Sequence, residues 1–215
     1  MKVTRKTKLI NHKEIQYTHI ENGSSVICFM FSGSGYTYDK PLFYYSTMTM
    51  LQNKFDIVHI HYSYGHDLFK LFSITDITKM VYDDVIHIIN EVIENNKHDD
   101  VIFLGKSLGT IPLINGLMKE NTFSNSKMIL FTPLLKFDTI FESLLSSHHN
   151  ALVVIGDRDP HYIPEKIEAL LEISNIKVVN VPDADHSLDI EPHHTLLSLK
   201  ALEGVMRELE MFVIG

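Results

Sequence analysis

A serine between two glycines is the feature of this sequence that most clearly carries chemistry. Gly105, Ser107 and Gly109 form the pattern G-x-S-x-G, directly after the apolar run at 101–104 and before a segment of helical character. Glycine at both positions permits a turn so tight that side chains there would clash with neighbouring backbone. Such a turn holds the serine hydroxyl at a helix N-terminus, where developing negative charge is stabilised. The pattern predicts a nucleophilic serine, although patterns of this length also occur by chance.

Two aspartates and a histidine follow at the ends of later apolar runs. Asp157 and Asp159 lie in GDRDP after one such run, and His186 lies in PDADHS after the last. A neutral histidine can take the serine proton near pH 7, and a carboxylate on its other ring nitrogen fixes the tautomer. Asp159 precedes Pro160, which holds it extended and projects its side chain from the loop. The alternatives are that Asp159 caps a helix, or that Asp157 is the acid and Asp159 is not.

Other polar residues compete for a functional role. His59 and His61 share one face of a predicted strand and His66 follows, so a three-histidine metal site is conceivable. The segment lacks a carboxylate at suitable spacing, and strand histidines more often pack or bond to the backbone. We therefore expect neither a metal nor a cofactor. Lys106, inside the G-x-S-x-G pattern, is expected to face solvent or the edge of the following helix.

The order of elements supplies a scaffold that gathers these residues. Loose alternation predicts two strands within 2–21, joined by a turn near Asn11. Strands are then predicted at 25–31, 55–62, 99–104, 128–131, 151–155 and 176–181. Helices are predicted between and after them, at 41–53, 74–96, 107–119, 137–147, 164–173 and about 192–212.

This alternation predicts an α/β fold in a single domain over residues 1–215. We expect a mostly parallel, twisted sheet with helices on both faces, an N-terminal antiparallel hairpin and no large lid. Open sheets of this kind place their sites at the carboxyl ends of the strands. The serine, the aspartates and His186 all follow predicted strands, so we expect them to meet at one edge.

Composition limits the classes of partner. The net charge is −8 with histidine neutral, which argues against a nucleic-acid or anionic-membrane surface. A single cysteine excludes an internal disulfide. Neither an apolar leader nor a run long enough to span a bilayer is visible. We expect a soluble, cytoplasmic protein that acts on a small molecule, and the sequence does not indicate its oligomeric state.

With its motifs in this order, the sequence resembles the α/β-hydrolase superfamily, and within it the small, lidless serine esterases and dienelactone-hydrolase-like proteins. The resemblance covers residues from about 25 to 215 and is specific in GKSLG, GDRDP and PDADHS. It implies Ser107 as nucleophile, His186 as general base and an aspartate of GDRDP, preferably Asp159, as the acid that orients the base. The dienelactone hydrolases proper use a cysteine nucleophile, so serine argues against that activity.

The resemblance also implies an oxyanion hole with two backbone donors. One is the N–H of Leu108, the residue after the nucleophile, and the other comes from the loop after the first buried strand. We place the second donor at Ser34, with Gly35 as the alternative. This loop begins Ser32-Gly33, whereas the superfamily usually has His-Gly there.

Residues near these donors are expected to line the substrate pocket. They are Gly35, Tyr36 and His66, although ordinary packing of the first helix explains Tyr36 equally well. The segment between Leu135 and Ala151, where many relatives insert a lid, is short, which predicts an open site. The resemblance thus implies hydrolysis of a small carboxylic ester or thioester through an acyl-enzyme. The alternative is a non-catalytic binding protein of the same fold.

Overall fold

The computed structural model describes residues 1–65, 67–190, 192 and 194–215. In this part of the chain one eight-stranded sheet has the order β1-β2-β4-β3-β5-β6-β7-β8. Its strands are β1 (Lys2–Ile10), β2 (Lys13–Glu21), β3 (Val26–Phe31), β4 (Asp56–His61), β5 (Asp100–Lys106), β6 (Lys127–Phe131), β7 (Ala151–Gly156) and β8 (Ile176–Val181). The β1–β2 and β2–β4 pairs are antiparallel and the other pairs are parallel. The predicted mostly parallel sheet with an N-terminal hairpin is confirmed.

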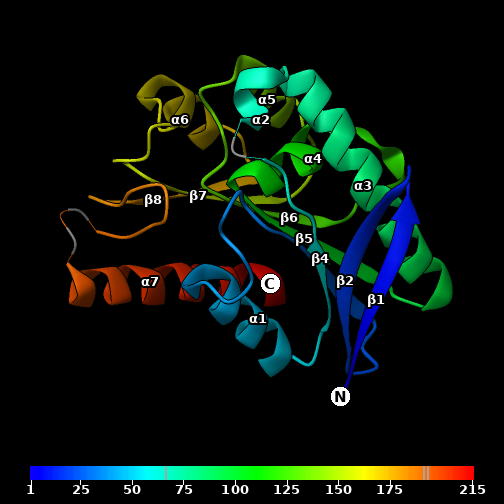
Figure 1. Cartoon of the computed structure of the whole chain (residues 1–215). Coiled ribbons are helices and arrows are strands. Elements are labelled where there is room, and N and C mark those ends of the chain that lie inside the picture. The colour runs from blue at the N-terminus through cyan, green and yellow to red at the C-terminus, as the bar shows by residue number, and fades with distance from the viewer. Residues whose placement is uncertain (66, 191, 193) are drawn as a thin grey trace.

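Helices cover both faces of the sheet (Figure 1). One face carries α1 (Pro41–Gln52) and α7 (Thr195–Ile214). The other carries α2 (Leu68–Leu71), α3 (Ile74–Asn95), α4 (Thr110–Asn115), α5 (Asp138–Leu145) and α6 (Pro164–Leu171). Short 3₁₀ turns lie at η1 (Ser107–Gly109), η2 (Leu117–Lys119) and η3 (Asn121–Phe123). Between β6 and β7, a segment described in full, the chain forms α5 and no large lid, as predicted.

The central strands are buried on both faces because their sequences are apolar throughout. In β3 the residues from Ile27 to Phe31 are all buried, and β7 is buried along its whole length. Alternate side chains of each strand enter the two apolar cores, one under each helical layer. Helix α3 shows the matching pattern, since its predicted stripe from Ile77 to Val92 faces the first core.

The register aligns the carboxyl ends of the parallel strands. Phe31 of β3 lies opposite Gly105 of β5, Lys106 lies opposite Phe131 of β6, and Gly156 of β7 lies opposite Val181 of β8. The chain passes from β3 to β4 on one side of β3 and returns to β5 on its other side, so the strand order reverses between β3 and β5. Loops at such a reversal splay apart and leave a crevice for ligands.

One local prediction is wrong, and one short helix was not predicted. The helix predicted at 107–119 is broken into η1, α4 and η2, because Gly116 leaves helical geometry, with φ −116° and ψ −87°. A Cβ at Gly116 would overlap the ring of Tyr82, so this bend lets α4 pack closely on α3. The short helix α2 was not predicted. Among the described residues, no helix is both long enough and apolar enough to cross a membrane.

Candidate active site

Ser107 stands on a strained turn between β5 and α4. Its φ is +52°, in the left-handed region that residues other than glycine rarely occupy. The flanking glycines are required by close packing, because a Cβ at Gly105 would press on the carbonyl of Gly109, and one at Gly109 would overlap the carbonyl of Phe31. The sequence therefore makes a sharp strand-to-helix turn here, and the serine side chain is presented at the sheet edge.

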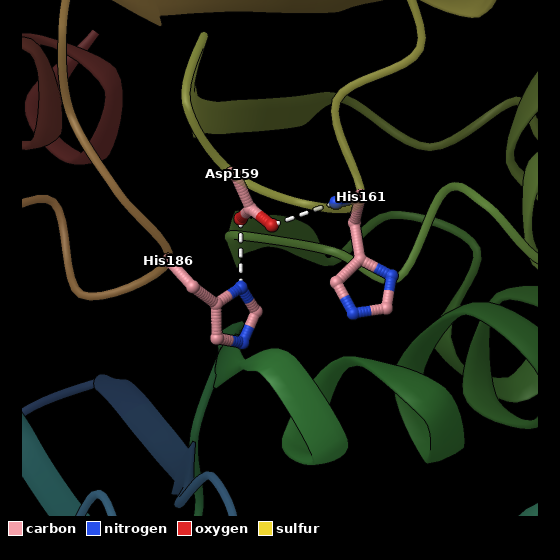
Figure 2. A group of neighbouring side chains, drawn as sticks. All are labelled: Asp159, His161 and His186. Carbon is pink, nitrogen blue, oxygen red and sulfur yellow. Dashed lines mark hydrogen bonds and ion pairs between the residues drawn. The ribbon is translucent and has the colours of Figure 1, made fainter.

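A continuous hydrogen-bonded chain joins this serine to His186 and Asp159. The Nε2 atom of His186 lies 2.9 Å from Ser107 Oγ, and its Nδ1 atom lies 2.7 Å from Asp159 Oδ2. Figure 2 shows Asp159 and His186 facing each other from separate loops, which follow β7 and β8. Because a carboxylate only accepts, Nδ1 carries the proton, and Nε2 is left to accept from the serine hydroxyl. This is the tautomer that a general base requires.

Burial differs sharply along this chain. The Asp159 side chain is fully buried, whereas the His186 side chain is 33% exposed. The carboxylate is thus held in a fixed, water-free position while the imidazole stays within reach of a substrate. The two loops meet because Gly156 has no side chain, since a Cβ there would overlap the carbonyl of Ala184.

The two candidate aspartates have different partners. Asp157 Oδ1 accepts from the backbone N–H of Asp183 at 2.7 Å, which ties together the loops after β7 and β8. Asp159 bonds His186 and, through Oδ1, accepts from the backbone N–H of His161 at 2.8 Å. It caps no helix, because α6 begins five residues later at Pro164 without a side-chain cap. The structure thus brings Asp159, and not Asp157, into contact with His186.

The loop after β3 passes directly over the serine. Gly33 and Tyr36 exchange two backbone hydrogen bonds across a tight turn. A Cβ on Gly33 would lie 3.5 Å from the Cβ of Ser107, so this loop closely approaches the serine. Ser34 is exposed in this turn, and Leu108 is buried in η1 directly after the serine. Both residues thus lie in segments that adjoin Ser107, and their role as oxyanion donors stays a prediction.

Two of the predicted pocket residues border a real cavity. Gly35 and Tyr36 line a cavity of about 580 Å³, together with Leu42 from α1, Ser187 from the His186 loop and Leu199 from α7. Tyr36 also accepts a hydrogen bond on its hydroxyl from the backbone N–H of Leu42, at 3.2 Å. Ser107, Asp159 and His186 do not line this cavity, which lies between the loops that follow β3 and β8 and the helices α1 and α7. The third predicted residue, His66, lies outside the described residues.

Lys106 does not face solvent, and this prediction is wrong. The side chain is buried, with an exposed fraction of 1%, because it turns inward beneath the loop that carries His186. Its Nζ donates to the backbone carbonyl of His186 at 2.9 Å and to Thr132 Oγ1 at 3.2 Å. No local sequence signal indicates this, since Thr132 and His186 are distant in the chain.

His161 is a site residue that the sequence analysis passed over. Its ring lies 5.3 Å from the ring of His186 (Figure 2), and burial lowers its pKa to about 4. Potential ligand atoms of Asp159, His161 and His186 lie within 4.8 Å of one another. Both Asp159 oxygens and both His186 ring nitrogens already have partners in the hydrogen-bonded chain. A cation at this position would have to break that chain.

The two histidines of β4 both pack on the ring of Tyr38 and bond different threonines. His59 stacks on Tyr38 with ring centroids 4.2 Å apart and bonds Thr47 Oγ1 through Nε2. His61 bonds Thr18 Oγ1 through its own Nε2. Each ring therefore has a packing role on its strand, as the simpler interpretation of strand histidines expects.

The comparisons with known proteins agree with this architecture. No protein-family model and no curated protein matches the sequence. Est1E from Butyrivibrio proteoclasticus with ferulic acid bound superimposes with a TM-score of 0.74 at 13% identity, over 97% of this chain and 98% of that chain. A serine hydrolase without lid, XC6422 from Xanthomonas campestris, gives 0.71 at 14%, over 98% and 93%. A dienelactone hydrolase from Anabaena variabilis gives 0.68 at 16%, over 96% and 97%. The chain thus has the lidless α/β-hydrolase fold.

Proposed function

We propose that this protein is a serine hydrolase that cleaves a small carboxylic ester or thioester. The observation that carries the proposal is the unbroken chain from Ser107 Oγ through the His186 ring to the buried Asp159 carboxylate. Three independent segments of the sequence converge to make it. The lidless serine hydrolase among the structural neighbours supports the same reaction class. The hydrogen bonds from Ser107 through His186 to Asp159 do not support a purely binding role, because binding alone would not need a strained serine bonded to a histidine.

The reaction follows from these contacts. Ser107 attacks the acyl carbon as His186 Nε2 takes its proton, and the buried Asp159 stabilises the resulting imidazolium. The tetrahedral intermediate collapses when the imidazolium gives that proton to the leaving alcohol or thiol. A water then attacks the acyl carbon of the acyl-enzyme as it loses a proton to His186. The imidazolium returns this proton to Ser107 Oγ as the bond between the acyl group and the serine breaks. The products are a carboxylic acid and an alcohol or thiol.

The negative charge of the tetrahedral intermediate needs donors on the opposite side of the acyl carbon. We assign the backbone N–H groups of Leu108 and Ser34 to this task. Leu108 lies in the first turn after Ser107, where amides have no earlier carbonyl to bond. Ser34 lies in the turn that Gly33 brings against the nucleophile. Each such donor contributes roughly 3 kcal/mol to lowering the barrier where this has been measured.

A row of aromatic rings leads from the catalytic histidine to the surface. The ring of His161 contacts that of His186, Phe137 contacts His161 with centroids 6.2 Å apart, and Phe69 of α2 stacks on Phe137 at 6.2 Å. Phe69 is 41% exposed. Because no lid covers this row in the part of the chain that the structure describes, we propose that an apolar or aromatic part of the substrate lies along it.

A panel of p-nitrophenyl esters and acyl-CoA thioesters of increasing chain length tests the proposal. We expect hydrolysis of at least one class, and a loss of roughly 10⁴- to 10⁶-fold in kcat for Ser107→Ala. Ser143→Ala is the matched control, because Ser143 lies half-buried on α5 and its hydroxyl donates to the carbonyl of Thr139. Hydrolysis that survives in Ser107→Ala would rule out this nucleophile. No turnover on any member would leave the binding protein as the better description.

A further inference from the structure

Lys106 is the only buried lysine among the described residues. Lysine is almost never fully buried without a partner, because removing an ammonium from water is costly. Its position is also unusual, since it is the last residue of β5 and directly precedes Ser107. Because this ammonium is buried beside the proposed nucleophile, its contacts indicate what Lys106 holds in place.

The ammonium is enclosed by groups from three other segments of the chain. It donates to Thr132 Oγ1 at the end of β6 and to the carbonyl of His186 in the loop after β8. The ring of Tyr36, from the loop after β3, lies 4.5 Å from Nζ. Cation–π attraction of this kind is strongest where water is excluded. Lys106 therefore joins the nucleophile strand to the two loops that carry the catalytic histidine and the proposed oxyanion donor.

The loop held in this way is strained on both sides of His186. Asp183 has a φ of +57° and Leu188 a φ of +64°, both in the left-handed region. Such a conformation persists only when contacts enforce it, and the bond from Lys106 to the His186 carbonyl is one of them. Without it, the main chain of His186 loses a contact that fixes its position relative to Ser107, and the imidazole is held only through its ring nitrogens.

Burial and neighbouring carboxylates act on the ammonium in opposite directions. Burial lowers the pKa of Lys106, while Asp159, Asp185 and Asp189 raise it, and burial prevails, so that the pKa falls to about 8. Among the described residues, no carboxylate lies within ion-pair distance of Nζ. The titratable and charged groups around it are Tyr36 after β3, Asp159 and His161 after β7, and Asp185, His186 and Asp189 after β8.

We infer that Lys106 is a positioning residue whose ammonium holds the main chain of His186 and so keeps the imidazole within hydrogen-bonding distance of Ser107. This role rests on the proposed hydrolase function, because it concerns the same site. It also makes the reaction sensitive to alkaline pH. A hydrogen bond from a charged donor is roughly twice as strong as one from a neutral donor, so loss of the Lys106 proton weakens the hold on His186.

Two substitutions at this position test the inference. Lys106→Met keeps the length of the side chain and removes its donors, and we expect kcat to fall about 100-fold with little change in KM. In the wild type, kcat should decrease as the pH rises above about 8, the pKa of this ammonium. Lys106→Gln supplies a donor that does not titrate, so it should recover part of kcat and lack this alkaline decrease.

Lys127 provides a matched control at the other end of the sheet. Its Nζ also donates to backbone carbonyls, those of Phe212 and Val213 at 3.1 Å each, and lies 6.0 Å from the ring of Phe212. Lys127→Met therefore removes the same kinds of contact without touching the site. We expect it to lower the melting temperature and to leave kcat and its pH profile unchanged.

A structural readout separates this inference from the proposed function. The proton shared by His186 Nδ1 and Asp159 should give a strongly downfield ¹H NMR signal, which we expect to weaken in Lys106→Met and persist in Lys127→Met.

If the wild type neither hydrolyses esters nor is labelled at Ser107, the proposed function fails, and the signal still reports on positioning. Wild-type kcat, pH profile and downfield signal in Lys106→Met would overturn the inference. If Lys106→Met does not fold, Lys106→Gln tests the inference instead. Absence of the alkaline decrease in kcat in Lys106→Gln supports it, and a wild-type decrease overturns it.

Discussion

The position and the hydrogen-bond partners of the Asp159 carboxylate are fixed by its surroundings. Its side chain is fully buried, one oxygen accepts from His186 Nδ1 and the other accepts from the backbone of His161. Replacing it with asparagine keeps the shape but allows an amide N–H to face the imidazole, which favours the wrong tautomer. We expect Asp159→Asn to lower kcat by about 10⁴-fold, measured by steady-state hydrolysis of the best ester.

Asp157→Asn is the matched control for that change. Asp157 is two residues away and also accepts a backbone N–H, from Asp183, but it does not contact His186. An asparagine oxygen can still accept this bond, so kcat should stay close to the wild-type value. Equal losses in the two variants would contradict the assignment of Asp159 as the orienting acid.

For single residues, the sequence predicted a role where that role depends on neighbours in the sequence. The proline after Asp159 was enough to prefer this aspartate, and it is the one that contacts His186. The location of Lys106 could not be predicted in the same way. Its burial depends on Thr132 and on His186, which is 80 residues away in the sequence. A side chain whose partners come from other elements has no local sequence pattern.

At the scale of elements, the turn that carries Ser107 depends on how closely α4 approaches β3. A methyl group at Gly109 would overlap the carbonyl of Phe31, so Gly109→Ala must displace the helix or the loop after β3. Overpacking of this kind costs about 1–3 kcal/mol. We expect lower stability in urea titrations together with a large loss of kcat.

Gly204→Ala is the corresponding control in α7. A Cβ there meets nothing within 4 Å, and Gly204 lies inside a long helix. Alanine should therefore stabilise the protein by about 0.5–1 kcal/mol and leave kcat unchanged. If Gly109→Ala were as stable and active as Gly204→Ala, close packing would not be what the elbow glycine provides.

Strands were easier to predict than helices for a physical reason. A strand buried on both faces is apolar along its whole length, and each predicted run corresponds to a strand of the sheet. The segment at 107–119 has helical composition throughout, yet it bends at Gly116, where the ring of Tyr82 of α3 packs so closely that a Cβ would overlap it. Such an interruption arises from packing between elements, and the sequence of one element does not encode it.

At the scale of the whole molecule, one sheet links residues from both ends of the chain, so we propose that residues 1–215 form a single domain. Its stability should depend on pH through buried histidines. Burial lowers the pKa of His59 and of His161 from 6.5 to about 4. Below about pH 6.5 the unfolded chain binds protons that the folded protein excludes. The free energy of unfolding should therefore decrease as the pH falls from 6.5 to 4.

Urea denaturation between pH 7 and pH 4.5 measures this dependence. Each such histidine contributes a slope of at most about 1.4 kcal/mol per pH unit. His59→Gln keeps a hydrogen-bonding group toward Thr47 and removes one titrating group, so the slope should decrease. Identical slopes in the wild type and in this variant would show that His59 does not contribute.

The central claim is that Ser107 is an activated nucleophile, and covalent labelling tests it most directly. The protein is treated with a fluorophosphonate, which phosphonylates only serines activated by a base, and the modified peptide is identified by mass spectrometry. We predict a single adduct on Ser107, abolished in Ser107→Ala and strongly slowed in Asp159→Asn. A wild-type protein that stays unlabelled beside a reacting control esterase, or an adduct that persists in Ser107→Ala, would contradict the account.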